Sequence, residues 1–161
     1  MKKVYSLENK KYKKIFIACS ISKYIDGNKF TDSNYRKFTE KLYDVCATYS
    51  DDVFMALRRE EYGKKIMKEM CTELDFCEMK TTDLVVAFPD DSKGVAVELG
   101  WASVFKKRII LVLDRNKRYT PLVSGLGDMT QVVIVWYENN LDNMLLESID
   151  VELRTMNLED K

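Results

Sequence analysis

The chain has 161 residues, of which 46% are hydrophobic, and its 26 basic residues balance its 26 acidic residues. This composition is typical of one globular domain, and it gives no electrostatic reason to expect a nucleic-acid partner. No apolar run approaches the roughly 18 residues of a membrane span, and the basic start lacks an apolar signal segment, so we expect a cytoplasmic protein without a membrane partner.

Histidine is absent from the chain, and the four cysteines lack the CxxC spacing of zinc ligands. A metal site and a His-based triad are therefore not expected. No cofactor is expected either, because no G-x-G-x-x-G follows the first predicted strand and no Walker loop occurs. Acid–base chemistry must come mainly from carboxylates, lysines or tyrosines.

Strand-like and helix-like segments alternate along the chain after a charged lead-in over residues 1–13. Aliphatic runs predict five short strands, at 15–20, 53–57, 84–88, 109–113 and 131–136. Apolar residues at helical spacing predict helices that begin near residues 33, 58, 94 and 139. The segment 21–33 is turn-rich and is predicted to be a loop, and the helix that begins near residue 58 is expected to continue to residue 78.

This alternation predicts a single doubly wound α/β domain over residues 1–161, with helices on both faces of a five-stranded parallel sheet. We expect the flavodoxin-like strand order 2-1-3-4-5. Residues 1–13 and 156–161 are expected to be loosely ordered. A signalling receiver domain is disfavoured, because the first strand ends in Ala18, Cys19 and Ser20 rather than in acids.

The stretch from Thr82 to Asp114 is the centre of the predicted fold. It reads as a buried strand, a polar turn, an amphipathic helix over about 94–105, a basic stop and a second buried strand. Both strands are continuous aliphatic runs, which is typical of parallel strands covered on both faces. Ligands of such sheets bind at the carboxyl ends of the strands, where the polar turn lies.

Glu98 is the acid that interrupts this helix. Few positions there are free to face water, because the neighbours of Glu98 are Val95, Val97, Leu99, Trp101 and Ala102. Ser92 and Gly94 precede it at the helix start, where backbone N–H groups and the helix dipole favour an anion. The pattern therefore indicates a working carboxylate beside an anion pocket, although a lone glutamate in a helix is more often a surface residue.

Four segments, which together cover most of the chain in order, carry a resemblance to a known family. They are IFIACSI at 15–21, ELDFCEMKTTDLVVAF at 73–88, DSKGVAVELGWASVFKKRIILVL at 91–113 and TPLVSGLGDMTQVVIVWY at 120–137. The chain resembles the nucleoside 2-deoxyribosyltransferase superfamily, and within it the 2'-deoxynucleoside 5'-phosphate N-hydrolases and nucleotide N-ribosidases. The most specific features are the Ser-x-Gly-Val-x-x-Glu-Leu-Gly pattern from Ser92 and an aspartate, Asp75, eight residues before Asp83.

The resemblance implies that Glu98 is a nucleophile at C1' of the sugar and that Asp75 handles the leaving base. Cleavage of an N-glycosidic bond builds positive charge on the sugar, so an ionised carboxylate at C1' stabilises the transition state and can trap the glycosyl group. A second carboxyl group assists the departing base. The alternative for Asp75 is a surface acid at the end of its helix, which the negative end of the helix dipole disfavours.

The resemblance also implies a substrate pocket, whose expected residues are Phe16, Ser20, Ser22, Ser92, Gly94, Thr120 and Arg58. Many deoxynucleotide hydrolases have a tyrosine where Phe16 stands, and a glycine and an arginine where Cys19 and Ser22 stand, so the choice between ribose and deoxyribose stays open. Ser20, Ser92 and the helix start are expected to bind a phosphate monoester, with Arg58 or Lys23 supplying charge.

Three functions remain open from the sequence. The first is hydrolysis of a (deoxy)ribonucleoside 5'-monophosphate to free base and pentose 5-phosphate, the second is transfer of deoxyribose between bases, and the third is nucleotide binding without catalysis. The resemblance further implies a homodimer with a shared active site, in which Thr120 reaches the pocket of the neighbouring subunit. The apolar excess on the Glu98 helix favours such an interface, and its residues are Val97, Trp101, Val104 and Phe105.

Overall fold

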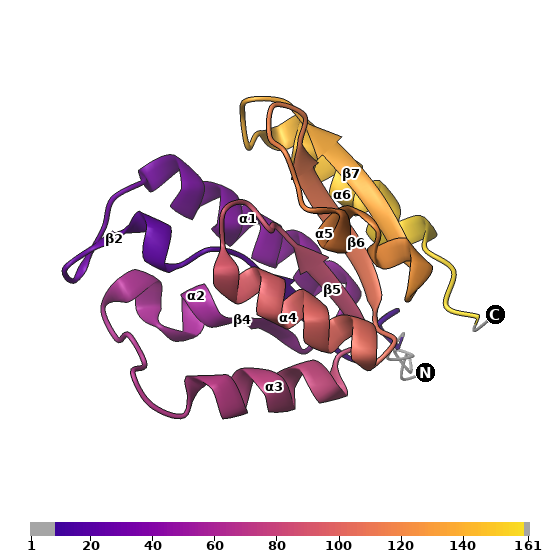
Figure 1. Ribbon diagram of the computed structural model, residues 1–161, viewed down its shortest axis with the longest axis horizontal. Coiled ribbons are helices and arrows are strands. Elements are labelled where there is room, and N and C mark those ends of the chain that lie inside the picture. The colour runs from indigo at the N-terminus through magenta and orange to yellow at the C-terminus, as the bar shows by residue number, and fades with distance from the viewer. Residues whose placement is uncertain (1–8, 160–161) are drawn as a thin grey trace, which may run out of the picture.

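The structure is a computed structural model that describes residues 9–159 (Figure 1). Five parallel strands form its central sheet in the order β4-β1-β5-β6-β7. The strands are β1 (Ile15–Ala18), β4 (Val53–Met55), β5 (Leu84–Ala87), β6 (Arg108–Asp114) and β7 (Val132–Tyr137). This order confirms the predicted flavodoxin-like sheet, because β1, β4, β5, β6 and β7 are the five strands predicted along the chain.

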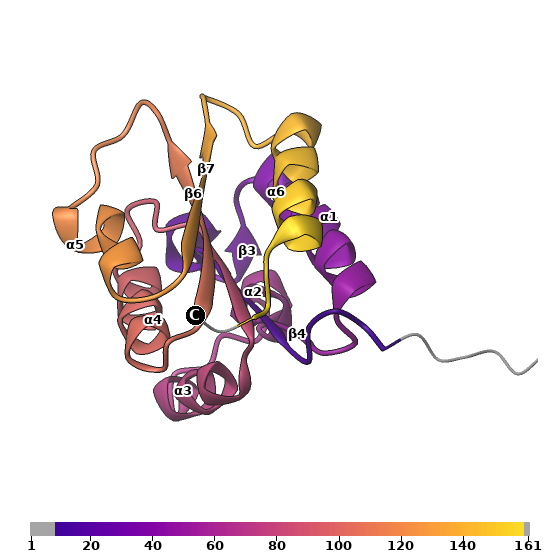
Figure 2. The same ribbon diagram turned by 90° about the vertical axis from the view of Figure 1, so that its right-hand side faces the viewer.

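Helices cover both faces of the sheet, as predicted (Figure 2). One face carries α1 (Ser33–Tyr49) and α6 (Asn143–Thr155), which contact each other. The opposite face carries α3 (Cys71–Thr81), α4 (Lys93–Val104) and the short α5 (Pro121–Ser124). Because side chains of a strand alternate between faces, the strands supply two cores, one with Ile17 and Val86 and the other with Ala18 and Val85.

The segment predicted as a loop over residues 21–33 is more regular than expected. It contains a 3₁₀ turn at Ser22–Tyr24 and a small antiparallel hairpin of β2 (Ile25–Asp26) and β3 (Lys29–Phe30). Strands of two residues carry too little apolar periodicity to be read from sequence. The hairpin matters because it forms one side of the candidate site.

The long helix predicted from residue 58 to 78 is wrong, because the chain folds as two separate helices. The first, α2 (Ala56–Arg59), ends before a 3₁₀ turn at Glu61–Gly63 in which all three residues have positive φ. Tyr62 accepts this left-handed conformation because its ring is buried edge-on against Phe30, with 5.5 Å between centroids. Tertiary packing thus overrides helix propensity, and α3 begins only at Cys71.

Gly63 has a specific steric role beside this turn. Its φ of +90° is strained for any L side chain, and a Cβ there would lie 2.9 Å from Cδ1 of Ile25. The turn and the hairpin can therefore pack closely only with glycine at this position.

The chain ends are more ordered than predicted within the described residues. Tyr12 is buried and its hydroxyl donates to the Leu153 carbonyl at 2.8 Å, and Met156 is buried in the same core. Tyr12 and Met156, both covered by the expectation of loose order, are therefore packed residues of this core. Residues 1–8 and 160–161, which the same expectation covered, lie outside the described part of the chain.

Candidate active site

A cavity of about 880 Å³ lies at the carboxyl ends of β1 and β5. Its walls come from the connection between β1 and β2, the end of α2, the first turns of α3 and the first turns of α4. The polar and charged residues of the lining are Ser20, Ser22, Lys23, Glu60, Asp75, Asp91, Ser92, Lys93 and Glu98. The structure therefore brings together most of the site residues predicted from the sequence.

Glu98 reaches the cavity from the second turn of α4. The helix is oriented by Val95 and Leu99, which are buried against the sheet, and it begins at Ser92, whose Oγ accepts a hydrogen bond from the Val95 N–H at 3.3 Å. Burial raises the pKa of Glu98 to about 8, the negative charge of Asp75 adds to the rise, and Arg59 opposes it. Glu98 is thus a carboxyl group whose ionisation is controlled by its neighbours.

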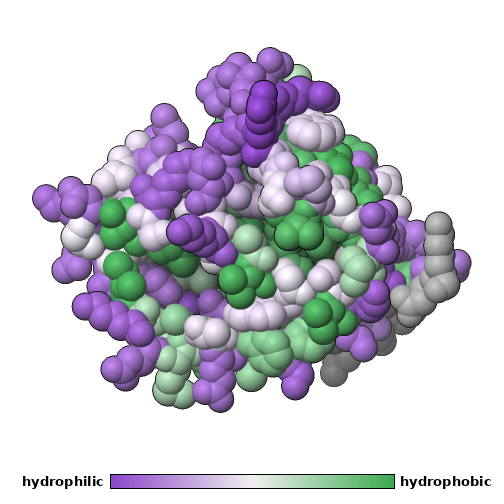
Figure 3. All heavy atoms as spheres, viewed as in Figure 1, coloured by the Kyte–Doolittle hydropathy of each residue, from purple (hydrophilic) through white to green (hydrophobic). Residues whose placement is uncertain are grey.

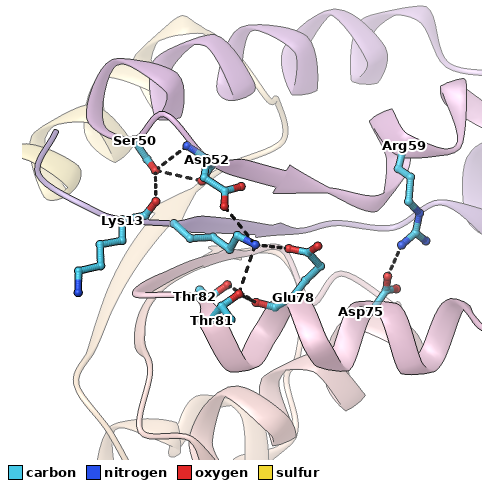
Figure 4. A network of polar contacts seen from close by, with 9 residues as sticks. Lys13, Ser50, Asp52, Arg59, Asp75, Glu78, Thr81 and Thr82 are labelled. Carbon is cyan, nitrogen blue, oxygen red and sulfur yellow. Dashed lines mark hydrogen bonds and ion pairs between the residues drawn. The ribbon is translucent and has the colours of Figure 1, made fainter.

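Asp75 faces the same cavity from α3, and Arg59 at the end of α2 forms an ion pair with it (Figure 4). Burial raises the pKa of Asp75, and the bond to Arg59 opposes this rise. The helix that carries Asp75 is anchored one turn later, where Lys14 of the chain before β1 bonds Glu78 and lies 3.2 Å from Asp52. These contacts connect α3 to the end of α2 and to the chain before β1.

The start of α4 offers an anion site at the cavity wall. The first N–H groups of any helix lack intrahelical acceptors, and the helix dipole makes this end positive. A Cβ added at Gly94 would meet only Ser92 Oγ, at 3.8 Å, so the backbone is open to a ligand. Ser20 and Ser22 line the same cavity, and Lys23 at its edge lies 3.8 Å from Asp90.

Three predicted residues do not line this cavity in the single chain. Phe16 is fully buried in the core, with its ring centroid 4.8 Å from that of Phe54, because alternation along β1 turns it into the sheet face under α3 and α4. Thr120 is exposed and caps α5, where its Oγ1 accepts from the Leu122 N–H at 3.3 Å. The expectation that Phe16 belongs to the substrate pocket is therefore corrected for the single chain.

Arg58 is the third of these residues, and its placement corrects the prediction that it supplies charge to a phosphate. Its guanidinium lies 3.8 Å from the ring centroid of Tyr43 on α1, in a separate hollow. Successive residues of a helix point about 100° apart, so Arg58 and Arg59 face different neighbours. The arginine beside the site is Arg59.

Arg59 and Glu60 are the residues that sequence reasoning missed. Glu60 is only 5% exposed, lines the cavity, and accepts a hydrogen bond from Arg59 at 3.0 Å. The signal was the run Arg-Arg-Glu-Glu, which begins three residues after the end of β4, near the edge where ligands of parallel sheets bind. Which members of the run face inward could not be read, because α2 is a single turn and has no periodicity.

A metal site finds no support in residues 9–159, where no group of three or more Cys, Asp and Glu side chains could hold an ion. Over the same residues, no helix has both the length and the apolar character needed to cross a membrane. Cys19 also lines the cavity, and burial raises the pKa of its thiol to about 12.

The fold and the site define a flavodoxin-like α/β protein with a pair of carboxyl groups in a cavity at the carboxyl edge of the sheet. The chain belongs to the nucleoside 2-deoxyribosyltransferase-like group, which includes the nucleotide N-ribosidases, and the resemblance read from the sequence is confirmed.

Solved structures similar to this chain support that assignment. The solution structure of BlsM is 30% identical over 89% of this chain and 91% of that chain, with a TM-score of 0.72. CMP N-glycosidase BcmB from Clostridium botulinum is 27% identical over 86% of this chain and 98% of that chain, with a TM-score of 0.65. A conserved protein from Enterococcus faecalis V583 is 16% identical over 88% and 97% of the two chains, with a TM-score of 0.61, and shares the fold.

No protein-family profile matches the sequence, and no curated protein is significantly similar to it.

Proposed function

We propose that this protein is an N-glycosidase that hydrolyses a nucleoside 5'-monophosphate to free base and pentose 5-phosphate. The main observation behind the proposal is that Glu98 and Asp75 line the same cavity, beside the N-terminal end of α4. The similarity to a protein described as a CMP N-glycosidase supports the same reaction.

The proposed reaction proceeds in two steps. Ionised Glu98 attacks C1' and forms a carboxylate–sugar ester, while the bond from C1' to the base nitrogen breaks and the base leaves with the electron pair. Asp75 donates a proton to that nitrogen: burial raises the pKa of Asp75 and so favours its protonated form, and the ion pair with Arg59 stabilises the carboxylate that remains. A water molecule then gives one proton to the Asp75 carboxylate and attacks C1', the bond from C1' to Glu98 breaks, and the pentose 5-phosphate is released, as in retaining glycosidases.

A panel of ribo- and deoxyribonucleoside monophosphates, assayed with and without an acceptor base, tests the proposal. Chromatography should detect free base and pentose 5-phosphate from at least one monophosphate, at a rate that does not require the acceptor. A new nucleoside that forms only when acceptor is present would favour the deoxyribosyltransferase alternative. Binding of monophosphates without any cleavage would overturn the proposed activity in favour of a nucleotide-binding module.

We expect Ser92→Ala to raise the KM for a monophosphate by about tenfold or more, and to change the KM of the matching nucleoside much less. The reason is that a hydrogen bond to a charged group contributes about 1.5–3 kcal/mol. Steady-state kinetics with both substrates measures the effect.

Asp142→Ala is the matched control, because Asp142 caps α6 by accepting from the Leu145 N–H at 3.0 Å and lies outside the Glu98 cavity. Both variants should lose about 1 kcal/mol of stability through the lost cap. If Ser92→Ala changes the KM of the nucleotide and of the nucleoside equally, Ser92 caps the helix and does not bind the phosphate.

A homodimer with a shared site is the second part of the proposal. The side of the molecule formed by α4 and α5 exposes large apolar side chains, with exposed fractions of 51% for Val97, 72% for Val104 and 83% for Leu122. Figure 3 shows green, hydrophobic surface over this region. Leu122 is two residues from Thr120, so a subunit packed on this surface could bring its Thr120 to the neighbouring cavity.

Mixing two inactive variants tests the shared site. Glu98→Ala and Thr120→Trp should each be inactive alone, and a mixed dimer should regain one working site, built from the intact Glu98 of one chain and the intact Thr120 of the other. Activity of the mixture should reach up to about half that of the wild type per mixed dimer. No recovery after subunit exchange is verified, or a monomer in sedimentation at assay concentration, would contradict the shared site.

A further inference from the structure

Arg59 stands behind the wall of the cavity and bonds two of the acids that line it. Its guanidinium forms an ion pair with Asp75 through one terminal nitrogen and bonds Glu60 at 3.0 Å through the other. The guanidinium also lies 5.4 Å from the ring centroid of Phe54. One arginine at the end of α2 therefore contacts both α3 and the edge strand β4, and Figure 4 shows its bond to Asp75 of α3.

The charges around the cavity explain why this arginine is needed. Glu60, Asp75 and Glu98 come from three different elements and line one cavity, so their negative charges repel one another. The other charged residues of the lining are Lys23, which lies 3.8 Å from Asp90, Asp91, which lies 3.8 Å from Lys117, and the exposed Lys93.

Two thiols, those of Cys19 and Cys71, complete the titratable groups of this wall. Arg59 forms ion pairs with both Asp75 and Glu60.

We infer that Arg59 is a positioning residue for this site: it holds Asp75 and Glu60 at the cavity wall and offsets their charge beside Glu98. The inference rests on the proposed function, in which Glu98 must be ionised to attack the sugar. Arg59 itself does not line the cavity and is not expected to touch the substrate. Arg59 therefore acts on the reaction through the carboxyl groups of Asp75 and Glu60, which it bonds.

Arg59→Met tests the inference, because methionine keeps part of the apolar stem and removes the charge. Loss of the positive charge favours the protonated form of Glu98, so a higher pH is needed to ionise it. The rise of kcat/KM with pH should therefore move to higher pH by about one unit or more, and kcat/KM at pH 7 should fall about tenfold or more.

Arg58→Met is the matched control, since Arg58 is the neighbouring arginine but packs on Tyr43 outside the cavity. It should leave the pH profile in place. Arg59→Lys keeps the charge and loses the two-pronged geometry, so it should keep a profile near that of the wild type with a lowered kcat. This variant keeps the test decisive if Arg59→Met does not fold. Arg59→Met combined with Asp75→Asn should cost less than the sum of the two single losses, because both act on one ion pair.

Carboxyl carbon NMR of Glu98, assigned by its absence in Glu98→Gln, separates this inference from the proposed function. Arg59→Met should shift the Glu98 titration to higher pH whether or not any nucleotide is cleaved. If the wild type cleaves no nucleotide but the titration moves, the proposed function fails and the role of Arg59 stands. The inference would be overturned if Arg59→Met changed neither the Glu98 titration nor the pH profile of kcat/KM. It would also be overturned if Arg58→Met shifted both to the same extent.

Discussion

Glu98→Gln should lower turnover of the preferred monophosphate by about a thousandfold or more while the fold stays intact. Glutamine keeps the size of the side chain but cannot form the ester with C1', and a nucleophile acts mainly on the barrier rather than on substrate binding. Single-turnover kinetics with a binding measurement on the same variant would check the result, because kcat should fall and the affinity for the nucleotide should change little. Wild-type turnover in Glu98→Gln would remove Glu98 from the mechanism.

The pH dependence of the thermal stability of Glu98→Gln is the control for its folding. The pKa of Glu98 rises from an ordinary value near 4.5 to about 8 in the folded chain. Between these pH values the folded state keeps a proton that the unfolded state has released, so this group makes the wild type lose stability as pH rises from about 4.5 to about 8.

Glutamine does not titrate, so Glu98→Gln should match or exceed the wild type in Tm at pH 9, and the difference should shrink toward pH 4. A Tm below that of the wild type at pH 9 would mean that the folded state stabilises the ionised Glu98 carboxylate, contrary to its raised pKa.

Asp75→Asn should reduce turnover by about a hundredfold for an ordinary base, since general acid assistance is worth about 10²–10⁴-fold. Asparagine keeps the shape of Asp75 and retains an oxygen that can accept from Arg59, but it cannot donate a proton as a carboxylic acid. For nucleotides with an electron-poor base that leaves readily, the loss should shrink to below about tenfold.

Comparison of kcat for the two substrate types measures this difference. If kcat falls by the same factor for both substrate types, Asp75 maintains the structure of the site and does not assist the leaving base. Because Asp75 is paired with Arg59, parallel measurement of Arg59→Met shows how much of any loss comes from the broken ion pair.

The amino-acid sequence by itself determined the layered fold of this protein. Its strands are uninterrupted aliphatic runs such as Leu84–Ala87, which must be buried on both faces, and a parallel sheet between two layers of helices satisfies that need. The position of Glu98 in the second turn of α4 followed from the same local pattern, because Ser92 caps the helix as its residue type predicts.

Tertiary structure alone decided which neighbours these acids have. Arg58 and Arg59 are chemically identical and adjacent, and only the packing of a one-turn helix directs Arg59 to Asp75 and Arg58 to Tyr43. Tyr62 takes a left-handed backbone because its ring is buried beside Phe30, and this turn ends the helix that periodicity predicted. Local propensities are worth less than about 1 kcal/mol per residue, whereas burial of an aromatic ring contributes more and a buried charge left without a partner costs more, so contacts between distant residues prevail where the two disagree.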